Sequence, residues 1–400
     1  MFALIFNPEG KQIDLGDLDR NNIGYKVYDD TTGITRILHR NRKFDTIVTI
    51  NGNYDYSEFN ALPYYIRRKW IDVPSERGIS GDDIVECFSG ALHEDFNEEV
   101  KCFSVFTPTF NSDLPKIDRL YASLCRQTYN EWEWCVVDDS PNGEVADYID
   151  NVIADVRVSA MRNVSHRGCI GFNKHMAAMM CSGYFLCEVD HDDELSPDCF
   201  ETILKANRAY PDSDFFYSYC IEAAGEEPVI YSDGWGYGYG STVTMDTFLG
   251  EKTFSATPDI NAVTIRTIYS QPNHIRVWKK DFYHRIGGHD MYLSVLDDQE
   301  LLIRTFLNGK MCKIPKVLYI QHEGEGERGR DETNAQSRRF DEIQRTTWLI
   351  KDRYEEKIHE RVLSLGHEDP VWVEEANSSA LRVVEKKVPP VNYVFDGCLG

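Results

Sequence analysis

The feature that most constrains the fold is a regular alternation of strand-like and helix-like segments between residues 102 and 220. Short apolar runs such as Cys102–Phe106 and Trp132–Val137 predict buried strands, and segments with apolar residues at helical spacing, such as Lys116–Arg126, follow them. Strands that alternate with helices favour a parallel sheet with helices on both of its faces. Further strands are expected at Val156–Met161, Tyr184–Val189 and Asp214–Cys220, and further helices at Gly143–Val152, Gly171–Cys181 and Pro197–Tyr210.

Changes in sequence texture divide the 400 residues into three predicted parts. Residues 1–97 are expected to form a small α/β domain, residues 101–325 the main α/β domain, and residues 331–400 a helical C-terminal extension with a tail. The acidic stretch at residues 93–100 is the expected first linker. Outside the alternating segment, strands are expected at Phe2–Phe6, Tyr25–Tyr28, Thr46–Ile50 and Val317–Gln321, and helices at Phe59–Val73, Asp297–Leu307 and Glu332–Gly366.

Composition narrows the classes of function. Lys and Arg number 43 against 66 Asp and Glu, and the formal charge of −23 opposes a basic nucleic-acid footprint but suits a protein that holds divalent cations. The eleven cysteines show no C-x-x-C spacing and lie mostly in apolar runs, which indicates buried free thiols rather than disulfides or a zinc site. No apolar run approaches the ~18 residues of a membrane span, and the first residues lack the basic start of a signal peptide, so we expect a cytoplasmic protein.

Two of the predicted strands end in acidic clusters, and this position makes the acids informative. In an open parallel sheet, ligands bind beyond the carboxyl ends of the strands. Asp138 and Asp139 follow one such strand, where a carboxylate can accept hydrogen bonds from a nucleotide base or a ribose hydroxyl. Capping of the next helix by Asp139 or Ser140 is the structural alternative.

The second cluster is Asp190-His191-Asp192-Asp193. Asp190 and Asp192 are two residues apart, so an extended chain projects both carboxylates to one side. Paired oxygens suit Mg²⁺ or Mn²⁺, which usually complete their shells with phosphate oxygens and water. A solvated acidic turn is the alternative, but an apolar strand that leads directly into three acids is costly unless something compensates them.

The third cluster begins a predicted helix with Asp297-Asp298-Gln299-Glu300. Acidic side chains in a first helical turn interact favourably with the helix dipole. The same place can present a general base close to a metal. Spacing alone favours neither interpretation.

An ordered series of motifs is more informative than any one of these clusters. It runs Ser104-Val-Phe-Thr-Pro-Thr-Phe-Asn111, Leu120-x-x-Ser-Leu-x-x-Gln127, Trp132-Glu-Trp-Cys-Val-Val-Asp-Asp-Ser140, Gly168–Asn173, Gly183-Tyr-Phe-Leu-x-x-x-Asp-x-Asp-Asp193 and Leu195-x-Pro197, and resumes at Gly287-Gly288 and Asp297-Asp298. This series resembles the inverting, metal-dependent family 2 glycosyltransferases, which have the GT-A fold, a Rossmann-like mixed sheet with helices on both faces. The resemblance covers neither residues 1–97 nor the C-terminal tail.

The resemblance implies which residues of the main domain contact the nucleotide-sugar donor. Thr107, Pro108 and Thr109 would line the nucleotide pocket. Asp139, or its neighbour Asp138, would hold the base or ribose of the donor, which is a UDP-sugar by family habit.

The resemblance also implies the metal ligands and the base. Asp190 and Asp192 would be the D-x-D pair through which Mn²⁺ or Mg²⁺ bridges the donor diphosphate. Asp298 matches the catalytic base, although Asp297 stands where the family usually has Glu, so the choice between these neighbours stays open. His322 falls where many such enzymes carry a late residue that contacts metal or diphosphate.

The implied reaction transfers a hexosyl or pentosyl group to an acceptor hydroxyl with inversion. Candidates for acceptor contacts lie in a Gly/aromatic loop and in a later mixed segment, because Gly lets a backbone approach a ligand and aromatic faces stack on sugar rings. A Gly-rich turn with aromatic core anchors is the alternative. The candidates are Trp235, Tyr237, His274 and Arg276.

The acceptor stays open among a glycan, a protein, a lipid head group and a modified nucleic-acid base. A GT-A core that binds a nucleotide sugar or glycan without turnover is the alternative function. A sugar nucleotidyltransferase is disfavoured, because the first strand of the main domain ends in Thr-Pro-Thr rather than in a Gly-rich basic signature. Residues 1–97 could bind the acceptor or form a homo-oligomer, and Phe59–Val73 is favoured as an amphipathic helix over a contact to an anionic acceptor.

Overall fold

The structure is a computed structural model of the chain. It describes residues 2–7, 10, 13–16, 18, 23–29, 34–40, 44, 46–50, 62, 66, 70–73, 79–80, 103–164, 168–225, 227–230, 242–267, 270–323, 339–369 and 393–394. Contacts between residues divide the chain into two compact units. The first comprises Met1–Cys102, Asn130–Glu133 and Asp147–Ser159, and the second comprises Phe103–Tyr129, Trp134–Ala146 and Ala160–Gly400. The three-part division into residues 1–97, 101–325 and 331–400 stays a prediction.

The first unit contains a small parallel sheet with the strand order β3-β1-β4-β5. Its central strands β1 (Phe2–Phe6) and β4 (Thr46–Ile50) are almost wholly buried and contribute to two apolar clusters, as expected for strands covered on both faces. The edge strands are β3 (Gly24–Tyr28) and β5 (Trp70–Val73), the described helix is α2 (Ile34–Arg40), and β2 (Ile13–Asp14) pairs separately with β6 (Ile79–Ser80).

The helix expected over Phe59–Val73 is wrong at its C-terminal end. Trp70–Val73 form β5, which pairs in parallel register with β4, and Trp70 Nε1 donates to Thr49 Oγ1 at 2.9 Å. Pairing with an available sheet edge outweighs the helical spacing of the apolar residues here. Most of residues 59–69 lie outside the described residues.

Within the described residues the larger sheet has ten strands, and its main path runs β11-β17-β12-β16-β10-β7-β8-β9. The strands expected between residues 102 and 321 are present with shifted ends, and β12 and β17 are longer than expected. The bounds are β7 Phe103–Thr109, β8 Trp132–Asp138, β9 Val158–Arg162, β10 Phe185–Glu188, β11 Glu194–Leu195, β12 Phe215–Ala224, β13 Glu227–Pro228, β16 Arg276–Lys279, β17 Met311–Glu323 and β18 Tyr393–Val394.

This sheet is mixed rather than parallel throughout. β7 and β10 run parallel, as do β12 and β17, but β16 runs antiparallel to both of its neighbours, β10 and β12. A parallel neighbour needs a crossover connection. Between β12 and β16, the described residues hold the two-residue strand β13, the hairpin of β14 (Thr242–Thr247) and β15 (Gly250–Ser255) and the four-residue helix α10 (Thr264–Thr267). β16 lies outside residues 102–220, the segment for which alternation predicts parallel strands, and the predicted mixed α/β fold class is confirmed.

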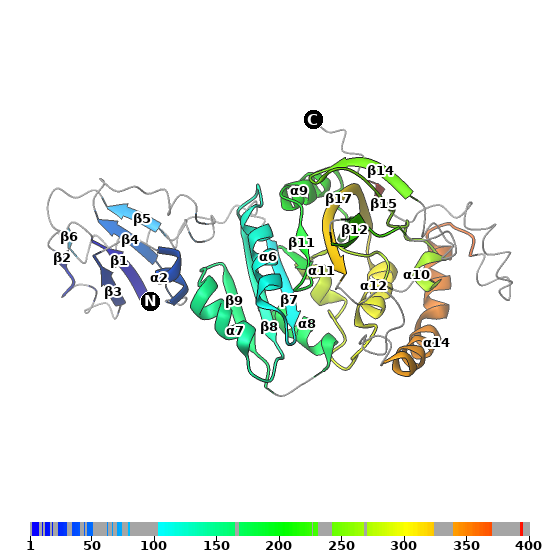
Figure 1. The fold of residues 1–400 in the computed structure, drawn as a ribbon, viewed down its shortest axis with the longest axis horizontal. Helices are drawn as coiled ribbons and strands as arrows, with labels where there is room; N and C mark the ends of the chain where they lie inside the picture. The colour runs from blue at the N-terminus through cyan, green and yellow to red at the C-terminus, as the bar shows by residue number, and fades with distance from the viewer. Residues whose placement is uncertain are drawn as a thin grey trace. The chain divides into compact units, whose positions relative to one another are not determined.

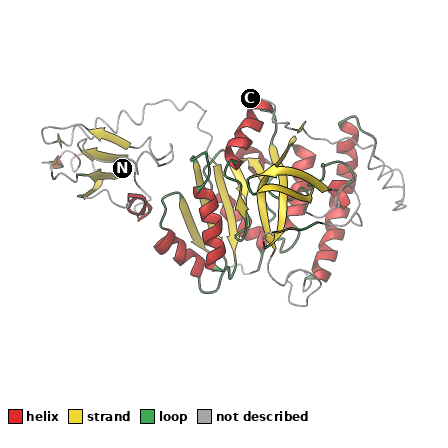
Figure 2. Ribbon diagram, turned by 45° about the horizontal axis from the view of Figure 1, so that its top comes forward, coloured by secondary structure: helices red, strands yellow, loops and turns green. Residues whose placement is uncertain are grey.

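Helices flank the larger sheet on either side (Figure 2). Because side chains alternate along a strand, Phe103 and Phe185 point to one face, and Phe106 and Leu186 point to the other. On the first face, Phe103 stacks on Phe200 of α9 with 4.5 Å between the ring centroids. The second face shares one apolar core with α8, α11 and α12. The helices are α6 Leu114–Cys125, α7 Glu144–Tyr148, α8 Ile170–Met179, α9 Cys199–Ala209, α11 Lys280–Arg285 and α12 Asp297–Asn308.

The C-terminal helix α14 (Phe340–Ser364) belongs to that same core. Its buried residues Ile350, Tyr354 and Ile358 lie at helical spacing. In Figure 1, α14 lies beside α12, with which it is in contact. Gly366 follows the last helical turn with a φ of +77°, a backbone conformation that glycine favours where a helix ends.

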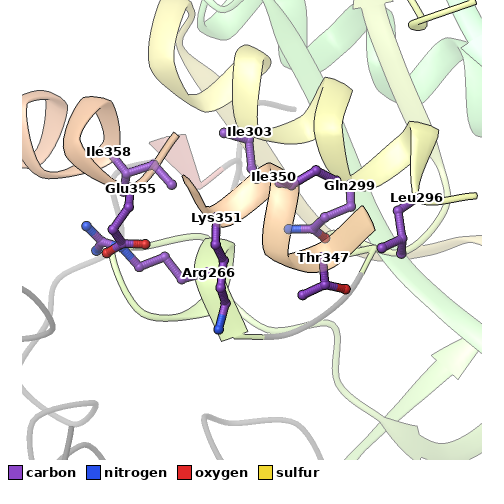
Figure 3. A pocket seen from close by; sticks show the side chains of 9 residues that line it. All are labelled: Arg266, Leu296, Gln299, Ile303, Thr347, Ile350, Lys351, Glu355 and Ile358. Atoms are coloured by element: carbon purple, nitrogen blue, oxygen red, sulfur yellow. The ribbon is translucent and has the colours of Figure 1, made fainter. Parts of the chain in front are cut away.

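A cavity of about 20 Å³ lies between α10, α12 and α14 (Figure 3). That volume is roughly the space of one water molecule. Arg266 of α10 lies beside it and pairs with Glu355 of α14 at 2.8 Å and with Asp369 at 2.8 Å. Gln299, the residue after Asp298, lines the cavity from α12. The C-terminal helix therefore packs directly behind the start of α12.

Eight of the eleven cysteines are described, all eight are free, and six of them are buried. Within the described part of the chain, the expectation of free thiols is therefore confirmed. Among the described helices, none is both long and apolar enough to cross a lipid bilayer.

Candidate active site

The carboxyl ends of β7 and β8 bring together the residues predicted to line a nucleotide pocket. Thr107 is buried, and its Oγ1 donates to the backbone oxygen of Val189, just after β10, at 2.8 Å. Thr109 Oγ1 donates to Asp138 Oδ1 at 3.2 Å. Pro108 is only partly buried. The two threonine hydroxyls therefore fasten neighbouring strand ends to one another and leave Pro108 as the accessible member of the three.

The carboxylates of Asp138, the last residue of β8, and of Asp139 both accept hydrogen bonds from N–H donors. Asp138 Oδ2 accepts from the backbone N–H of Ala146 in α7 at 3.1 Å. Asp139 accepts from Asn163 Nδ2 at 3.0 Å and from the backbone N–H of Gly168 at 2.9 Å. Capping by Asp139 or Ser140, the structural alternative, is therefore wrong, because the carboxylate that bonds the first turn of α7 is that of Asp138. Asp139 instead fastens the chain that leads to α8, and its contact with a nucleotide stays a prediction.

Asp190 and Asp192 follow β10 and keep 34 % and 25 % of their side chains exposed. Asp190 Oδ2 lies 3.3 Å from His274 Nε2, and Asp192 Oδ2 lies 3.6 Å from Lys116 Nζ. Desolvation opposes ionisation of Asp190, but the adjacent His274 and the nearby Lys174 hold the pKa of that carboxyl below its ordinary value. Both aspartates are therefore reachable carboxylates, and Asp190 is ionised at neutral pH.

The donor atoms around Asp190 fit a divalent cation. Ligand atoms of Glu188, Asp190 and His274 lie within 4.8 Å of one another. Lys174 and Arg276 already match the charge of Glu188. The cation would therefore take an oxygen ligand from Asp190 and a nitrogen ligand from His274, a set that suits Mn²⁺. Within the described chain this cluster includes neither of the other two predicted metal ligands, Asp192 and His322, and His322 Nε2 lies 3.0 Å from Glu194 Oε1.

Tyr319 of β17 fixes the turn that carries these aspartates. Its hydroxyl donates to Asp193 Oδ2 at 2.6 Å and accepts from the backbone N–H of Asp190 at 3.1 Å. Its ring stacks on His274 with 4.7 Å between centroids. Desolvation and the neighbouring Asp190 raise the pKa of Asp193 well above its ordinary value. Asp193 is therefore a buried, structural member of the acidic cluster.

A buried ion cluster of Glu188, Arg276 and Lys174 lies next to Asp190, and sequence analysis names only Arg276 of these three. Glu188 and Arg276 are direct cross-strand partners in the antiparallel pair of β10 and β16. Glu188 Oε1 lies 3.2 Å from Arg276 Nη1 and 2.6 Å from Lys174 Nζ of α8. Desolvation opposes the charge of Glu188, but Lys174 and Arg276 hold its pKa well below the ordinary value.

Part of this cluster has a sequence signal. Glu188 is two residues before Asp190 in an apolar run, and the two-residue period of a strand places both side chains on one face. Lys174 has no comparable signal, because a lone lysine in a helix is ordinarily exposed. Here it is buried, and its pKa is raised well above the ordinary value, since Asp297 and Glu188 outweigh the desolvation that would lower it.

Asp297 and Asp298 begin α12 in two different environments. Asp298 Oδ2 lies 3.1 Å from Arg276 Nη1, and 18 % of its side chain is exposed. Desolvation opposes its ionisation, but Arg276 and Lys174 lower its pKa. Asp297 is 4 % exposed, lies 3.6 Å from Lys174 and from His289, and has a pKa that desolvation raises. Asp298 is therefore the ionised and reachable carboxylate of the pair.

The Gly287-Gly288 pair positions His289 in this cluster. The two glycines have φ values of +94° and +63°, which other residues rarely adopt, and a Cβ on Gly288 would lie 2.7 Å from the ring of Tyr283. The close approach lets Tyr283 Oη bond His289 Nδ1 at 2.8 Å. His289 Nε2 then lies 3.6 Å from Glu188 Oε2.

The residues expected on the acceptor side are only partly described. Trp235 and Tyr237 lie outside the described residues. His274 and Arg276 are described and buried. They lie inside the site, against Asp190 and Asp298, rather than on an open surface.

Three kinds of comparison relate the chain to known proteins. A family model described as "Glycosyl transferase family 2" matches residues 104–281. The chain is 28 % identical over 151 residues to "GalNAc(5)-diNAcBac-PP-undecaprenol beta-1,3-glucosyltransferase" of Campylobacter jejuni, a match that covers 37 % of this chain and 48 % of that protein. It is 30 % identical over 117 residues to "Uncharacterized protein y4gI" of Sinorhizobium fredii, covering 29 % of this chain and 13 % of that protein. The chain thus spans about half or less of the length of these curated relatives.

Solved structures with a similar arrangement include those of S. aureus TarS residues 1–349. The complex of that protein with UDP-GlcNAc aligns with a TM-score of 0.46 and 18 % identity over 71 % of this chain and 78 % of that one. The complex with UDP aligns with a TM-score of 0.43 and 19 % identity over 56 % of this chain and 61 % of that one.

Proposed function

We propose that this chain is a glycosyltransferase that moves a sugar from a nucleoside-diphosphate donor to an acceptor hydroxyl with inversion, a proposal supported by the match of residues 104–281 to the model for glycosyl transferase family 2. One observation carries the proposal. Two ionised and partly exposed carboxylates, Asp190 and Asp298, lie on either side of the buried pair formed by Glu188 and Arg276. Asp190 can bind a cation, and Asp298 can accept a proton.

Asp298 acts as the general base in this proposal. It accepts the proton of the acceptor hydroxyl while the hydroxyl oxygen forms a bond to the anomeric carbon. The bond from that carbon to the diphosphate oxygen breaks in the same displacement, and the nucleoside diphosphate leaves with the bonding electrons. A single displacement from the opposite side inverts the anomeric configuration and needs no carboxylate nucleophile, unlike a retaining glycosidase.

Asp190 and Asp192 would hold the metal, and His274 would add a nitrogen ligand. A divalent cation bound there supplies positive charge that stabilises the departing diphosphate. We place His274 rather than His322 beside the cation, because His274 Nε2 lies 3.3 Å from Asp190 Oδ2 whereas His322 Nε2 pairs with Glu194.

The donor that we propose is a UDP-sugar, as the resemblance of residues 102–220 implies. Its nucleotide would lie against the ends of β7 and β8, where Pro108 is only partly buried. The acceptor is one of the four classes named above, and a role for residues 1–97 in acceptor binding or homo-oligomerisation stays a prediction. We also propose a cytoplasmic location, because buried free thiols such as those described here are typical of a reducing compartment.

Calorimetric titration of the full chain tests the proposal. UDP, GDP, CDP and dTDP would each be titrated with and without Mn²⁺, first into the wild-type chain and then into Asp190→Ala/Asp192→Ala. The matched control is Asp246→Ala/Asp352→Ala, which removes the same charge from two exposed carboxylates on β14 and α14. We expect Mn²⁺-dependent binding of UDP that is lost in the first double variant and kept in the control.

Other results would redirect the proposal in defined ways. Binding of another nucleotide would keep the transferase and change the donor. UDP binding without donor hydrolysis or transfer to any acceptor class would favour the alternative, a nucleotide-sugar-binding module. Absence of nucleotide binding in every condition would contradict the proposed function.

A further inference from the structure

The guanidinium of Arg276 lies between the two halves of the proposed site. Its Nη1 is 3.2 Å from Glu188 Oε1 and 3.1 Å from Asp298 Oδ2. Its Nε and Nη2 donate to the backbone oxygens of Pro272 at 3.0 Å and Ser270 at 2.8 Å. The side chain is only 1 % exposed. Two carbonyl groups and two carboxylates therefore fix both the position and the plane of the guanidinium.

The register of the sheet explains this placement. Arg276 is the first residue of β16, and it pairs with Glu188 of β10 on one side and with Tyr217 of β12 on the other. Glu188 precedes Asp190 by two residues. Arg276 is thus anchored to the strand that carries the proposed metal ligand, and it reaches the helix that carries the proposed base, Asp298.

The loop that holds Arg276 is itself tied to α12. Gln299, the residue after Asp298, accepts from the backbone N–H of Ser270 at 2.6 Å and donates through Nε2 to the backbone oxygen of Ile265 at 2.9 Å. Ser270 has a φ of +56°, a conformation that residues other than glycine seldom adopt. Hydrogen bonds therefore join the segment that orients Arg276 to the helical turn that carries Asp298.

We propose that Arg276 is a positioning residue for the transfer reaction. It holds the Asp298 carboxylate in one orientation and at a fixed distance from the end of β10, which Asp190 follows. This inference rests on the proposed function and deepens it. It replaces the acceptor contact that sequence analysis expected of Arg276, because the buried guanidinium is occupied by protein groups.

The charges around Asp298 make the role measurable. Desolvation raises the pKa of Asp298, and Arg276 opposes it more strongly than any other group, so that the pKa lies below its ordinary value. Removing the charge of Arg276 should therefore raise the pH at which Asp298 loses its proton. The groups that face Asp298 are Arg276 from β16, Lys174 from α8, Glu188 from β10, the Ser270 hydroxyl and the neighbouring Asp297.

Two substitutions in the full chain separate charge from geometry. Arg276→Lys keeps the charge, but a single ammonium group on a flexible stem cannot span the two carboxylates and two carbonyl groups. We expect it to lower kcat about 10²-fold, the cost of a misplaced catalytic group. Nucleotide affinity and the acid limb of the kcat/KM profile should stay near wild type. Arg276→Gln should lower kcat at least as much and move the acid limb to higher pH.

Arg304 provides matched control variants. Its guanidinium contacts the carboxylate of Glu300 and, like that of Arg276, two backbone oxygens, here those of Ile286 and Gly288. It does not contact Asp298. Arg304→Lys and Arg304→Gln should leave the acid limb in place. If Arg276→Gln fails to unfold cooperatively, the kcat of Arg276→Lys, which keeps the buried positive charge, remains the test of the inference.

The outcomes separate this inference from the proposed function. A wild-type kcat in Arg276→Lys overturns the inference. So does an acid limb that moves equally in the Arg276→Gln and Arg304→Gln variants, because a general structural defect then explains the loss. Absence of nucleotide binding in the wild-type chain overturns the proposed function first, and the inference with it.

Discussion

The ends of β8 and β10 carry a similar sequence signal, an apolar strand that leads into a cluster of acids, but the acids have different roles in the two places. After β8, Asp138 and Asp139 are buried and accept hydrogen bonds from backbone and amide N–H groups. After β10, Asp190 and Asp192 are partly exposed and face basic side chains. A carboxylate at a strand end thus has a structural role when N–H groups donate to both of its oxygens. It stays available to a ligand when it faces basic side chains and solvent.

The chain that follows each strand explains the difference. After β8, α7 begins within a few residues and offers the unpaired backbone N–H groups of its first turn, one of which bonds Asp138. After β10, the chain turns into the two-residue strand β11, and the next helix, α9, begins only at Cys199. No helix begins close enough for its backbone N–H groups to bond Asp190, so the negative charge of Asp190 is stabilised by His274 and Lys174 instead.

The largest expected effect falls on activity at the β10 side. Asp298→Asn removes the proposed base and should lower kcat by about 10³-fold, the range measured for loss of a general base. The isosteric amide keeps the packing of α12, so nucleotide affinity should stay near wild type. Steady-state transfer assays and calorimetry on the same preparation would measure both.

Asp297→Asn is the control for that substitution. Because Asp297 is buried with a raised pKa, its amide variant should keep far more activity than Asp298→Asn. Equal losses in the two variants would contradict the assignment of the base. A wild-type rate in Asp298→Asn would contradict the role of Asp298 as the general base.

The next effect is on stability. Glu188→Gln leaves Lys174 and Arg276 buried with an unmatched charge, and loss of one partner of a buried ion pair costs about 3–5 kcal/mol. Asp138→Asn loses one acceptor for backbone N–H groups and should cost about 1–3 kcal/mol. Urea unfolding monitored by tryptophan fluorescence gives both free energies. A larger loss of unfolding free energy in Asp138→Asn than in Glu188→Gln would show that the N–H hydrogen bonds of Asp138 stabilise the fold more than the buried ion pairs of Glu188.

Acid titration sharpens that ranking. The folded pKa of Glu188 is lowered, so in the folded chain Glu188 stays ionised where the unfolded chain takes up a proton, near pH 4.3. Its stabilisation is therefore fully present above about pH 4.3 and is lost as the pH falls toward the folded pKa. The free energy of unfolding of the wild-type chain should decline below that pH, and Glu188→Gln should show a shallower decline.

Asp193→Asn is the control for the titration, because the pKa of Asp193 is raised. Its folded form gains stability as the pH falls through the raised pKa, and this gain is complete by about pH 4, the ordinary value of an aspartate. Asp193→Asn should therefore change the profile above about pH 4 and leave the slope below it unchanged. An unchanged slope in Glu188→Gln would show that the buried pair does not govern acid unfolding.

The parts of this molecule that sequence predicts are those with a local signal. The strand at Trp132–Val137 and the helix start at Asp297 follow from apolar spacing and from acids placed at element ends. The direction of β16 and the pair of Glu188 with Arg276 depend on register between residues 88 apart in the chain, which no local pattern encodes. The choice between Asp297 and Asp298 likewise needs the burial of each side chain, because neighbouring positions on a helix differ by rotation and not by sequence signal.

The smallest expected effect concerns the pair of Lys116 and Asp192, whose Nζ and Oδ2 atoms lie 3.6 Å apart with both side chains partly exposed. Exposed pairs contribute about 0.2–1 kcal/mol, so Lys116→Ala should lower the free energy of unfolding by less than about 1 kcal/mol. The difference should vanish in 1 M salt, where the screening length is about 3 Å. Urea unfolding of both chains at low and high salt would measure this. A cost above about 2 kcal/mol that persists in 1 M salt would mean that Asp192 is bound to the fold as tightly as Asp138. The second aspartate of the D-x-D pair would then belong with the structural acids after β8, and Asp190 alone would remain for the cation.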